Sequence, residues 1–180
     1  MLSGKYGKYL ITGKPKMGKT TAIMKVAEEL KNRVAGFYTA EIKQGKQRLG
    51  FEIVSLTSGQ RALLAHVDVK SSKQVGKYGV CPENLNSFIE EIEEVLKAQE
   101  PKIILIDEIG KMELFSQRFR EVVLNAVDSI HHPLVATIME RSEPFCDALK
   151  TRPEINLLEL NYENRDIITA ELLNEIRVGL

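Results

Sequence analysis

A short stretch near the amino terminus combines glycines, a lysine and a threonine in a spacing that suits phosphate binding. It matches the pattern G-x-x-x-x-G-K-[ST] and consists of Gly13, Lys14, Pro15, Lys16, Met17, Gly18, Lys19 and Thr20. In such a loop, consecutive backbone N–H groups converge on an anion, and the start of the following helix adds about half a positive charge. The glycines let the backbone come close to phosphate oxygens. This stretch, the P-loop or Walker A motif, predicts nucleoside triphosphate binding, with Lys19 at the β- and γ-phosphates.

Two adjacent carboxylates follow an apolar run in the middle of the chain. The run is Ile103–Ile106, and Asp107 and Glu108 come directly after it. Because the run is continuously apolar, it predicts a central parallel strand that is buried on both faces. Asp107 fits the Walker B role, in which it holds Mg²⁺ opposite the Thr20 hydroxyl. We expect the strand to end at this point, so that a turn aims Glu108 at the γ-phosphate, where it orients an attacking water and accepts its proton.

A positive group that stabilises the transferring γ-phosphoryl group is a further requirement of this chemistry. Arg165 stands at a helix start and Arg48 in a hairpin, and a surface ion pair is the alternative for each. A partner protein could instead supply the arginine. Thr137 ends another predicted strand and could sense the γ-phosphate, although threonine is also a good strand former. The segment 141–152 could form a mobile lid or a plain surface loop.

Other polar residues receive simpler interpretations. His66, His131 and His132 stand at no metal-ligand spacing, so we assign them no catalysis. The first part of the chain is locally basic, which phosphate steering explains more economically than RNA binding. The lysines concerned are Lys5, Lys8, Lys14, Lys16 and Lys19.

The elements that must position these residues follow from the alternation of apolar runs with helix-period segments. This pattern predicts an α/β sandwich of three layers, in which helices cover both faces of a mostly parallel sheet. We expect strands at 9–12, 103–106, 134–138 and 156–160, an antiparallel hairpin of 34–43 and 48–56, and helices at 23–30, 85–96, 119–127 and 167–176. Between residues 58 and 82 only a short strand near 78–80 is legible. No linker divides the chain, so we expect one domain over residues 1–180.

Composition narrows the class of protein. The 180 residues include 25 Lys plus Arg and 25 Asp plus Glu, and a net charge of zero makes a dedicated nucleic-acid binder unlikely. No stretch reaches the ~20 apolar residues of a membrane span. The cysteines Cys81 and Cys146 are isolated, which excludes a zinc module and a disulfide framework. We expect a reduced, cytoplasmic protein that does not contact membranes.

The residues that follow the two carboxylates make a resemblance specific. The stretch Asp107–Ser116, together with Gly36–Thr39, Arg48–Phe51 and Glu163–Arg165, resembles the small P-loop nucleoside-triphosphatases known from thermophilic microbes and, as the cancer-related nucleoside-triphosphatase, from animals. The resemblance covers nearly the whole chain. It implies a RecA-like P-loop core with an inserted antiparallel hairpin, Mg²⁺ dependence and slow hydrolysis of ATP, GTP and other triphosphates. The implied nucleotide contacts are Gly13 to Thr20 and the Walker B stretch Ile104, Leu105, Ile106, Asp107, Glu108, Ile109, Gly110 and Lys111.

Three functions remain open at this point. The first is a Mg²⁺-dependent triphosphatase that accepts ATP, GTP, CTP and UTP, because the P-loop reads phosphates only and a guanine-reading Asn-Lys-x-Asp sequence is absent. The second is a kinase that moves the γ-phosphate onto a nucleoside, a nucleotide or a polynucleotide end. The third is a nucleotide-dependent binding module, in which slow hydrolysis only resets the state that binds a partner. We expect a monomer, and an activating partner remains open.

Overall fold

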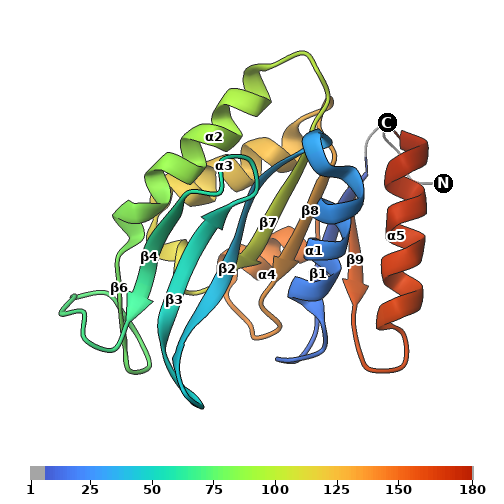
Figure 1. Ribbon diagram of the computed structural model, residues 1–180. Helices are drawn as coiled ribbons and strands as arrows, with labels where there is room; N and C mark the ends of the chain where they lie inside the picture. Colours follow the sequence, from blue (N-terminus) through green and yellow to red (C-terminus); the bar gives the residue numbers. More distant parts are fainter. Residues whose placement is uncertain (1–6, 180) are drawn as a thin grey trace.

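Within residues 7–179 the chain forms a nine-stranded mixed sheet, and helices cover both of its faces (Figure 1). The computed structural model describes residues 7–179. From edge to edge the strands are ordered β5-β6-β4-β3-β2-β7-β8-β1-β9. Their bounds are β1 Lys8–Thr12, β2 Val34–Gln44, β3 Gln47–Ser55, β4 Arg61–His66, β5 Gln74–Val75, β6 Tyr78–Val80, β7 Ile103–Ile109, β8 Leu134–Ile138 and β9 Ile155–Glu159.

The sheet divides into a parallel part and an antiparallel part. β2, β7, β8, β1 and β9 are parallel, whereas β3, β4, β6 and β5 continue the sheet in antiparallel fashion. The β2–β3 hairpin therefore joins the two parts. Because β8 separates β1 from β7, the P-loop and the carboxylates of β7 face each other across one intervening strand.

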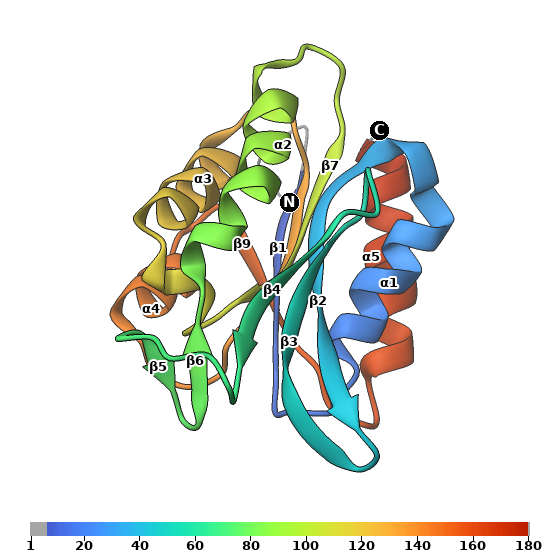
Figure 2. The same ribbon diagram turned by 60° about the vertical axis from the view of Figure 1, so that its left-hand side comes forward.

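Helices form the outer two layers (Figure 2). α1 (Lys19–Leu30) and α5 (Arg165–Gly179) cover one face, and α2 (Asn86–Lys97) and α3 (Gln117–Asp128) cover the other. The predicted three-layer α/β sandwich with its antiparallel hairpin is confirmed. No helix within residues 7–179 is long and apolar enough to cross a bilayer.

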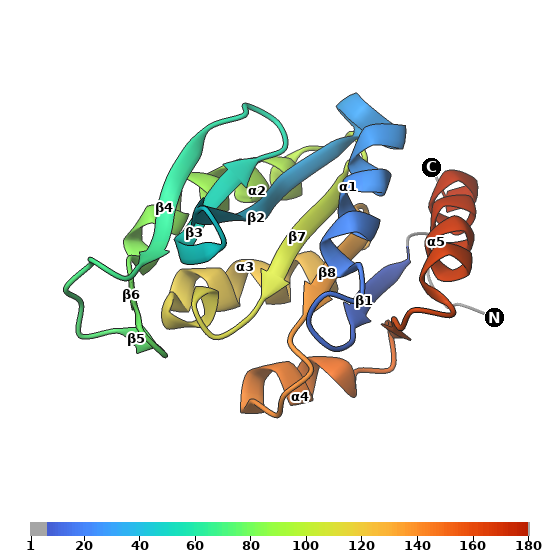
Figure 3. The same ribbon diagram turned by 60° about the horizontal axis from the view of Figure 1, so that its bottom comes forward.

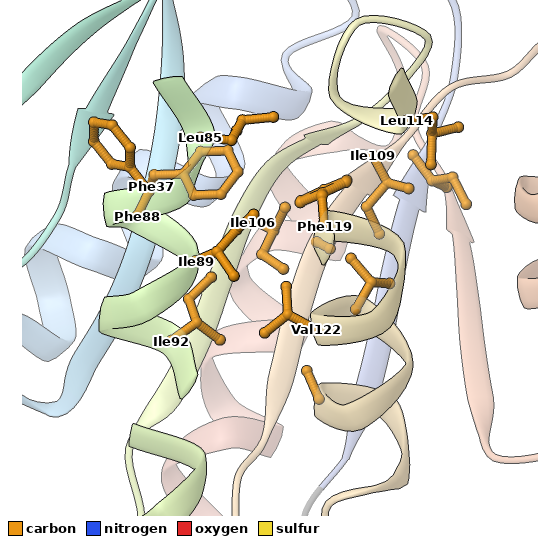
Figure 4. Packing of buried hydrophobic residues seen from close by; sticks show 14 of the residues in the cluster. Phe37, Leu85, Phe88, Ile89, Ile92, Ile106, Ile109, Leu114, Phe119 and Val122 are labelled. Carbon is orange, nitrogen blue, oxygen red and sulfur yellow. The ribbon is translucent and has the colours of Figure 1, made fainter. Parts of the chain in front are cut away.

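The larger of the two cores lies between the sheet and the α2–α3 layer (Figure 4). Phe37 of β2 stands at its centre, with its ring 6.0 Å from that of Phe88 and 6.1 Å from that of Phe119. All three side chains are fully buried. Aromatic contacts thus join β2 to α2 and α3. They hold this helical layer against the sheet, in which β2 is the neighbour of the carboxylate-bearing strand β7.

Two segments differ from the sequence-based expectation. Residues 58–82, of which only Tyr78–Val80 was predicted, contain two more strands, β4 and β5. The segment 141–152, expected to be a lid or a surface loop, contains the helix α4 (Pro144–Lys150), whose first turn is capped by the Glu143 side chain. Figure 3 shows α4 near the P-loop end of the sheet.

Lys8 has a role unlike the phosphate steering expected for it. It lies at the amino end of β1, the end opposite the P-loop, and is only 5% exposed. Its Nζ donates to the carbonyl oxygens of Ala126 (2.9 Å) and His132 (2.5 Å), so it ties β1 to the end of α3. Burial lowers the pKa of Lys8 to about 8, against the opposing charges of Asp128 and Glu154. Lys8 is therefore a structural tether, and Lys5 lies outside the described residues.

The burial of Lys8 predicts a specific pH dependence of stability. Its pKa is about 8 in the folded chain and 10.5 in the unfolded one, so the fold gains stability as the pH rises through this interval and loses it as the pH falls. In Lys8→Met this contribution is absent. The free energy of unfolding of the wild type relative to Lys8→Met should therefore rise by on the order of 2 kcal/mol between these pH values. Urea unfolding at several pH values measures it. A difference that stays flat with pH would contradict the assignment, and Lys14→Met, at an exposed lysine, is the control.

Candidate functional site

The P-loop connects β1 to α1 at the carboxyl end of the parallel strands (Figure 3). Its backbone takes left-handed conformations at Gly13 (φ 140°), Lys16 (φ 68°) and Gly18 (φ 99°). A Cβ atom at Gly13 would lie 2.5 Å from the carbonyl oxygen of Leu160, so the backbone just after β9 requires this glycine directly. Close approach of a phosphate, the reason expected from the sequence, is not needed to explain it. Met17 anchors the loop by packing against the core beneath α1 and α5.

Lys19 closes over the loop from the first turn of α1. Its Nζ donates to the carbonyl oxygens of Gly13 (2.6 Å) and Lys14 (3.1 Å). The ammonium group is thus held at the loop, where an anion cradled by the backbone N–H groups would meet it. Lys14, Pro15 and Lys16 are exposed around it.

Asp107 is the most constrained polar residue of the site. Its carboxylate is 1% exposed and accepts two hydrogen bonds, from the hydroxyl of Thr20 at 2.9 Å and from that of Thr137 at 2.5 Å. Burial raises the pKa of Asp107, while both hydroxyls and the charge of Lys19 oppose this rise. The contact joins β7, β8 and α1, and it brings together the two predicted metal ligands, Thr20 and Asp107.

Thr137 acts on this carboxylate. Sequence reasoning suggested that its hydroxyl could sense a γ-phosphate. In the structure the side chain is fully buried and its hydroxyl donates to Oδ1 of Asp107, which leaves Oδ2 to Thr20. Thr137 therefore orients the Asp107 carboxylate.

The donor set at Thr20 and Asp107 consists of one hydroxyl and one carboxylate. Within residues 7–179 there is no cluster of three or more His, Cys, Asp or Glu side chains that could hold a metal ion. Mg²⁺ prefers oxygen ligands and typically keeps several waters, binding through one or two carboxylates together with substrate phosphates. The residues present fit this mode of binding and do not form a closed cage.

Glu108 lies in the strand and not in the turn that the sequence suggested. β7 continues to Ile109, and its pairing with β8 shifts register between Ile106 and Ile109. Burial raises the pKa of Glu108, the neighbouring charge of Asp107 raises it further, and Lys19 opposes both. One carboxylate oxygen lies 3.2 Å from the position that a Cβ of Gly110 would take.

Glu113 is a member of the site that sequence reasoning missed. Its Oε2 lies 3.2 Å from the same Cβ position at Gly110, so its carboxyl group and that of Glu108 flank one glycine. The residue is 5% exposed, and burial followed by the charge of Glu108 raises its pKa to about 8. A single glutamate gives no sign of burial in the sequence, and only its position among Met112, Leu114 and Phe115, shortly after the two carboxylates, could have drawn attention to it.

The apolar residues of the predicted Walker B contact stretch serve the core. Leu105 packs beneath α1 and α5, whereas Ile104, Ile106 and Ile109 pack beneath α2 and α3. All four are 0% exposed, so they position the carboxylates and present no side chain to solvent. Gly110 and the exposed Lys111 follow at the end of the strand.

The two candidate arginines occupy different places. Arg165 begins α5, and its Cδ lies 3.5 Å from where a Cβ of Gly18 would be, which puts it against the P-loop. Arg48 is held on the hairpin, where its guanidinium donates to Glu41 (2.6 Å) and to the Tyr78 hydroxyl (3.2 Å). These partners favour the surface ion pair as the role of Arg48.

Comparison with known proteins gives a consistent result. The profile of a family described as NTPase matches residues 8–173. A protein named nucleoside-triphosphatase THEP1 from Natranaerobius thermophilus is 48% identical over 172 residues, which cover 95% of this chain and 97% of that protein. The protein of the same name from Thermotoga maritima is 42% identical over 171 residues, covering 94% and 95%.

Solved structures agree with the sequence comparisons. The crystal structure of THEP1 from Aquifex aeolicus matches with a TM-score of 0.83 at 36% identity, covering 94% of this chain and 98% of that one. The solution structure of a human cancer-related nucleoside triphosphatase matches with a TM-score of 0.80 at 30% identity, covering 95% and 97%.

The buried carboxyl group of Glu113 predicts that Glu113→Gln alters the pH dependence of stability. The pKa of Glu113 is raised from 4.5 to about 8 in the fold, so its contribution to stability is complete below pH 4.5 and is lost as the pH rises through 8. Gln cannot ionise. The variant should therefore gain stability relative to the wild type as the pH rises, by on the order of 3 kcal/mol at pH 9.

Denaturant unfolding at about pH 5 to about pH 9 measures the difference in the free energy of unfolding between Glu113→Gln and the wild type. Glu121→Gln, at an exposed position of α3, is the matched control and should show no such trend. Parallel curves for the two variants would refute the assignment.

Proposed function

Since the chain belongs to the NTPase family and is a nucleoside-triphosphatase, a hydrolase, we propose that it requires Mg²⁺ and hydrolyses ATP, GTP, CTP and UTP to the diphosphate and phosphate. The observation that carries the proposal is the contact of Thr20 with Asp107 beside the P-loop. It brings the phosphate cradle, with its Thr20 hydroxyl, together with a carboxylate from a second, distant part of the sequence. The names of the relatives favour hydrolysis over the kinase and binding-module alternatives.

In the proposed reaction the phosphates lie in the P-loop, where the backbone N–H groups and Lys19 face their charge. Thr20 and Asp107 would hold Mg²⁺, which would supply positive charge against the negative charge that develops during transfer. Glu108 orients a water molecule and accepts its proton as the water oxygen bonds to the γ-phosphorus. The bond from that phosphorus to the bridging oxygen breaks, and the diphosphate keeps this oxygen.

Broad base tolerance follows from the chemistry of the cradle. Its donors are backbone N–H groups and one ammonium group, which read phosphate and not the base. We further propose that a monomer of one domain is sufficient for the reaction. Strands from the two ends of the chain, β1 and β9, are neighbours in one sheet, which supports a single domain. An activating partner would act by adding an arginine.

Phosphate release from the four triphosphates, with Mg²⁺ or with EDTA, tests the proposal. We expect Mg²⁺-dependent release from all four. Glu108→Gln, which cannot accept the proton, should lower kcat by roughly 100-fold or more. Lys19→Ala should abolish nucleotide binding and release, and Lys46→Ala, in the exposed hairpin turn, is the control.

Each contrary outcome bears on one part of the proposal. Comparable turnover by Glu108→Gln would remove that residue from its role. Release from only one nucleotide would overturn base tolerance, and release in EDTA would overturn the need for a metal ion. Consumption of ATP only when a phosphoryl acceptor is added would replace hydrolysis by transfer.

The hydrogen bond from Thr137 to Asp107 predicts a separate effect on the metal. Thr137→Val keeps the shape of the side chain but removes the donor that orients the carboxylate. We expect the Mg²⁺ concentration for half-maximal release to rise about tenfold, corresponding to one good hydrogen bond to a charged group. Thr137→Ser should restore the wild-type value. Equal Mg²⁺ dependence in the Val and Ser variants would rule out this positioning role.

A further inference from the structure

A hollow of about 180 Å³ lies beside the P-loop, between the amino-terminal parts of α1 and α5. Gly18, Thr21 and Lys25 line it on the α1 side, and Arg165 and Asp166 line it on the α5 side. Lys25 and Asp166 form an ion pair at 3.5 Å, so the two helices are bridged at this point. The hollow is thus bordered by the phosphate-binding loop itself.

Two consecutive residues of α1 show on which side of the P-loop the hollow lies. The Thr20 hydroxyl points to Asp107, which lies toward the metal and γ-phosphate side of the site. Thr21 is turned by about 100° around the helix axis relative to Thr20, and it lines the hollow. A triphosphate whose terminal phosphate lies near Asp107 therefore has its α-phosphate and nucleoside on the side of Gly18 and Thr21.

Arg165, a half-buried residue that lines this hollow, lies against the exposed ring of Tyr162. The Arg165 guanidinium carbon lies 5.5 Å from the centroid of the Tyr162 ring, and Tyr162 is 65% exposed. Among the ion pairs within residues 7–179, none includes Arg165. A planar cation beside an aromatic ring, with no carboxylate to hold it, can stack with another planar group.

The loop that carries Tyr162 is held rigid by its own side chains. Oδ1 of Asn161 accepts from the backbone N–H groups of Glu163 and Asn164, and Oδ1 of Asn164 accepts from the N–H group of Asn161. Nδ2 of Asn164 in turn donates to the carbonyl oxygen of Glu159 at the end of β9. The backbone around Tyr162 is therefore fixed relative to the sheet before any ligand binds.

We infer that this hollow, with the Arg165–Tyr162 pair as its stacking surface, binds the nucleoside part of the substrate. The inference rests on the proposed function and adds to it a site for the base. Stacking is available to every nucleobase because every base has a π-face, and it depends little on the pattern of donors and acceptors. The acidic group that could read a base edge here, Asp166, is paired with Lys25. The site thus supplies affinity for any base, and Arg165 acts on the nucleoside and not on the γ-phosphate.

A tryptophan at position 162 reports on the stacking directly. The chain has no tryptophan, so Tyr162→Trp introduces a single indole fluorophore. We expect its emission to change on addition of each of the four nucleoside triphosphates with Mg²⁺, and to stay constant with inorganic tripolyphosphate, which has no base. Val178→Trp, at an exposed position far along α5, is the control and should respond to neither. An unchanged signal from Tyr162→Trp with all four nucleotides would overturn the inference.

Binding measurements separate the base from the phosphates. Tyr162→Ala should raise the dissociation constants and KM values of the four nucleotides about tenfold and leave kcat and the affinity for tripolyphosphate unchanged. Arg165→Lys, which keeps the charge but removes the planar group, should shift nucleotide affinity in the same direction by a smaller factor. Ile167→Ala, at a neighbouring exposed position, should match the wild type. A lower kcat in Arg165→Lys at saturating nucleotide would assign Arg165 to the γ-phosphate and overturn the inference.

Failure of this inference and failure of the proposed function give different results. If the wild type releases phosphate from the nucleotides in a Lys19-dependent way while Tyr162→Ala is unaffected, only the nucleoside site is wrong. If the wild type binds tripolyphosphate and nucleotides but releases no phosphate, the hydrolase proposal fails, and the fluorescence response still decides the nucleoside site.

Discussion

The buried carboxylate of Asp107 is the constraint on which the arrangement of the site depends. A charge removed from water is costly unless hydrogen bonds replace its hydration. The hydroxyls of Thr20 and Thr137 supply these bonds from α1 and β8. They can do so only if β8 lies between β1 and β7 and if the P-loop places the start of α1 at the carboxyl ends of the parallel strands. The hydrogen bonds to the buried carboxylate therefore depend on the strand order, on the bend of the P-loop and on the position of Asp107 together.

Further carboxyl groups lie close to Asp107. Asp107, Glu108 and Glu113 all lie near the end of β7, and burial or a neighbouring carboxylate raises the pKa of each of them. Lys19 is the cation that opposes the rise at Asp107 and Glu108. Carboxylates in this balance favour a divalent cation beside them, so they repel a triphosphate that brings such an ion less than one that does not.

The elements that were predicted correctly are those that a short local sequence pattern specifies. The P-loop spacing, the apolar run of β7 and the two arms of the hairpin can each be recognised from a few consecutive residues. β4 was missed because its Ala-Leu-Leu-Ala centre is not typical of a strand, and its conformation depends on pairing with β3. The short helix α4 carried a readable signal in Pro144 preceded by a capping Glu143. The burial of Lys8 and Glu113 was not predictable, because only the packing of distant elements removes these groups from water.

The two outermost strands have a consequence for behaviour at high concentration. The sheet ends on one side with β5, which has two residues, and on the other with β9, which has five. An exposed strand edge is a template on which another chain can add a strand, and the risk grows with the length of the unpaired edge. The longest strand within residues 7–179, β2 with 11 residues, pairs with β7 only over Val34–Tyr38, so the remainder of β2 is paired on one side only, with β3. The hairpin end of β2, and not the two short outermost strands, is therefore the longest unpaired edge to which another chain could add a strand.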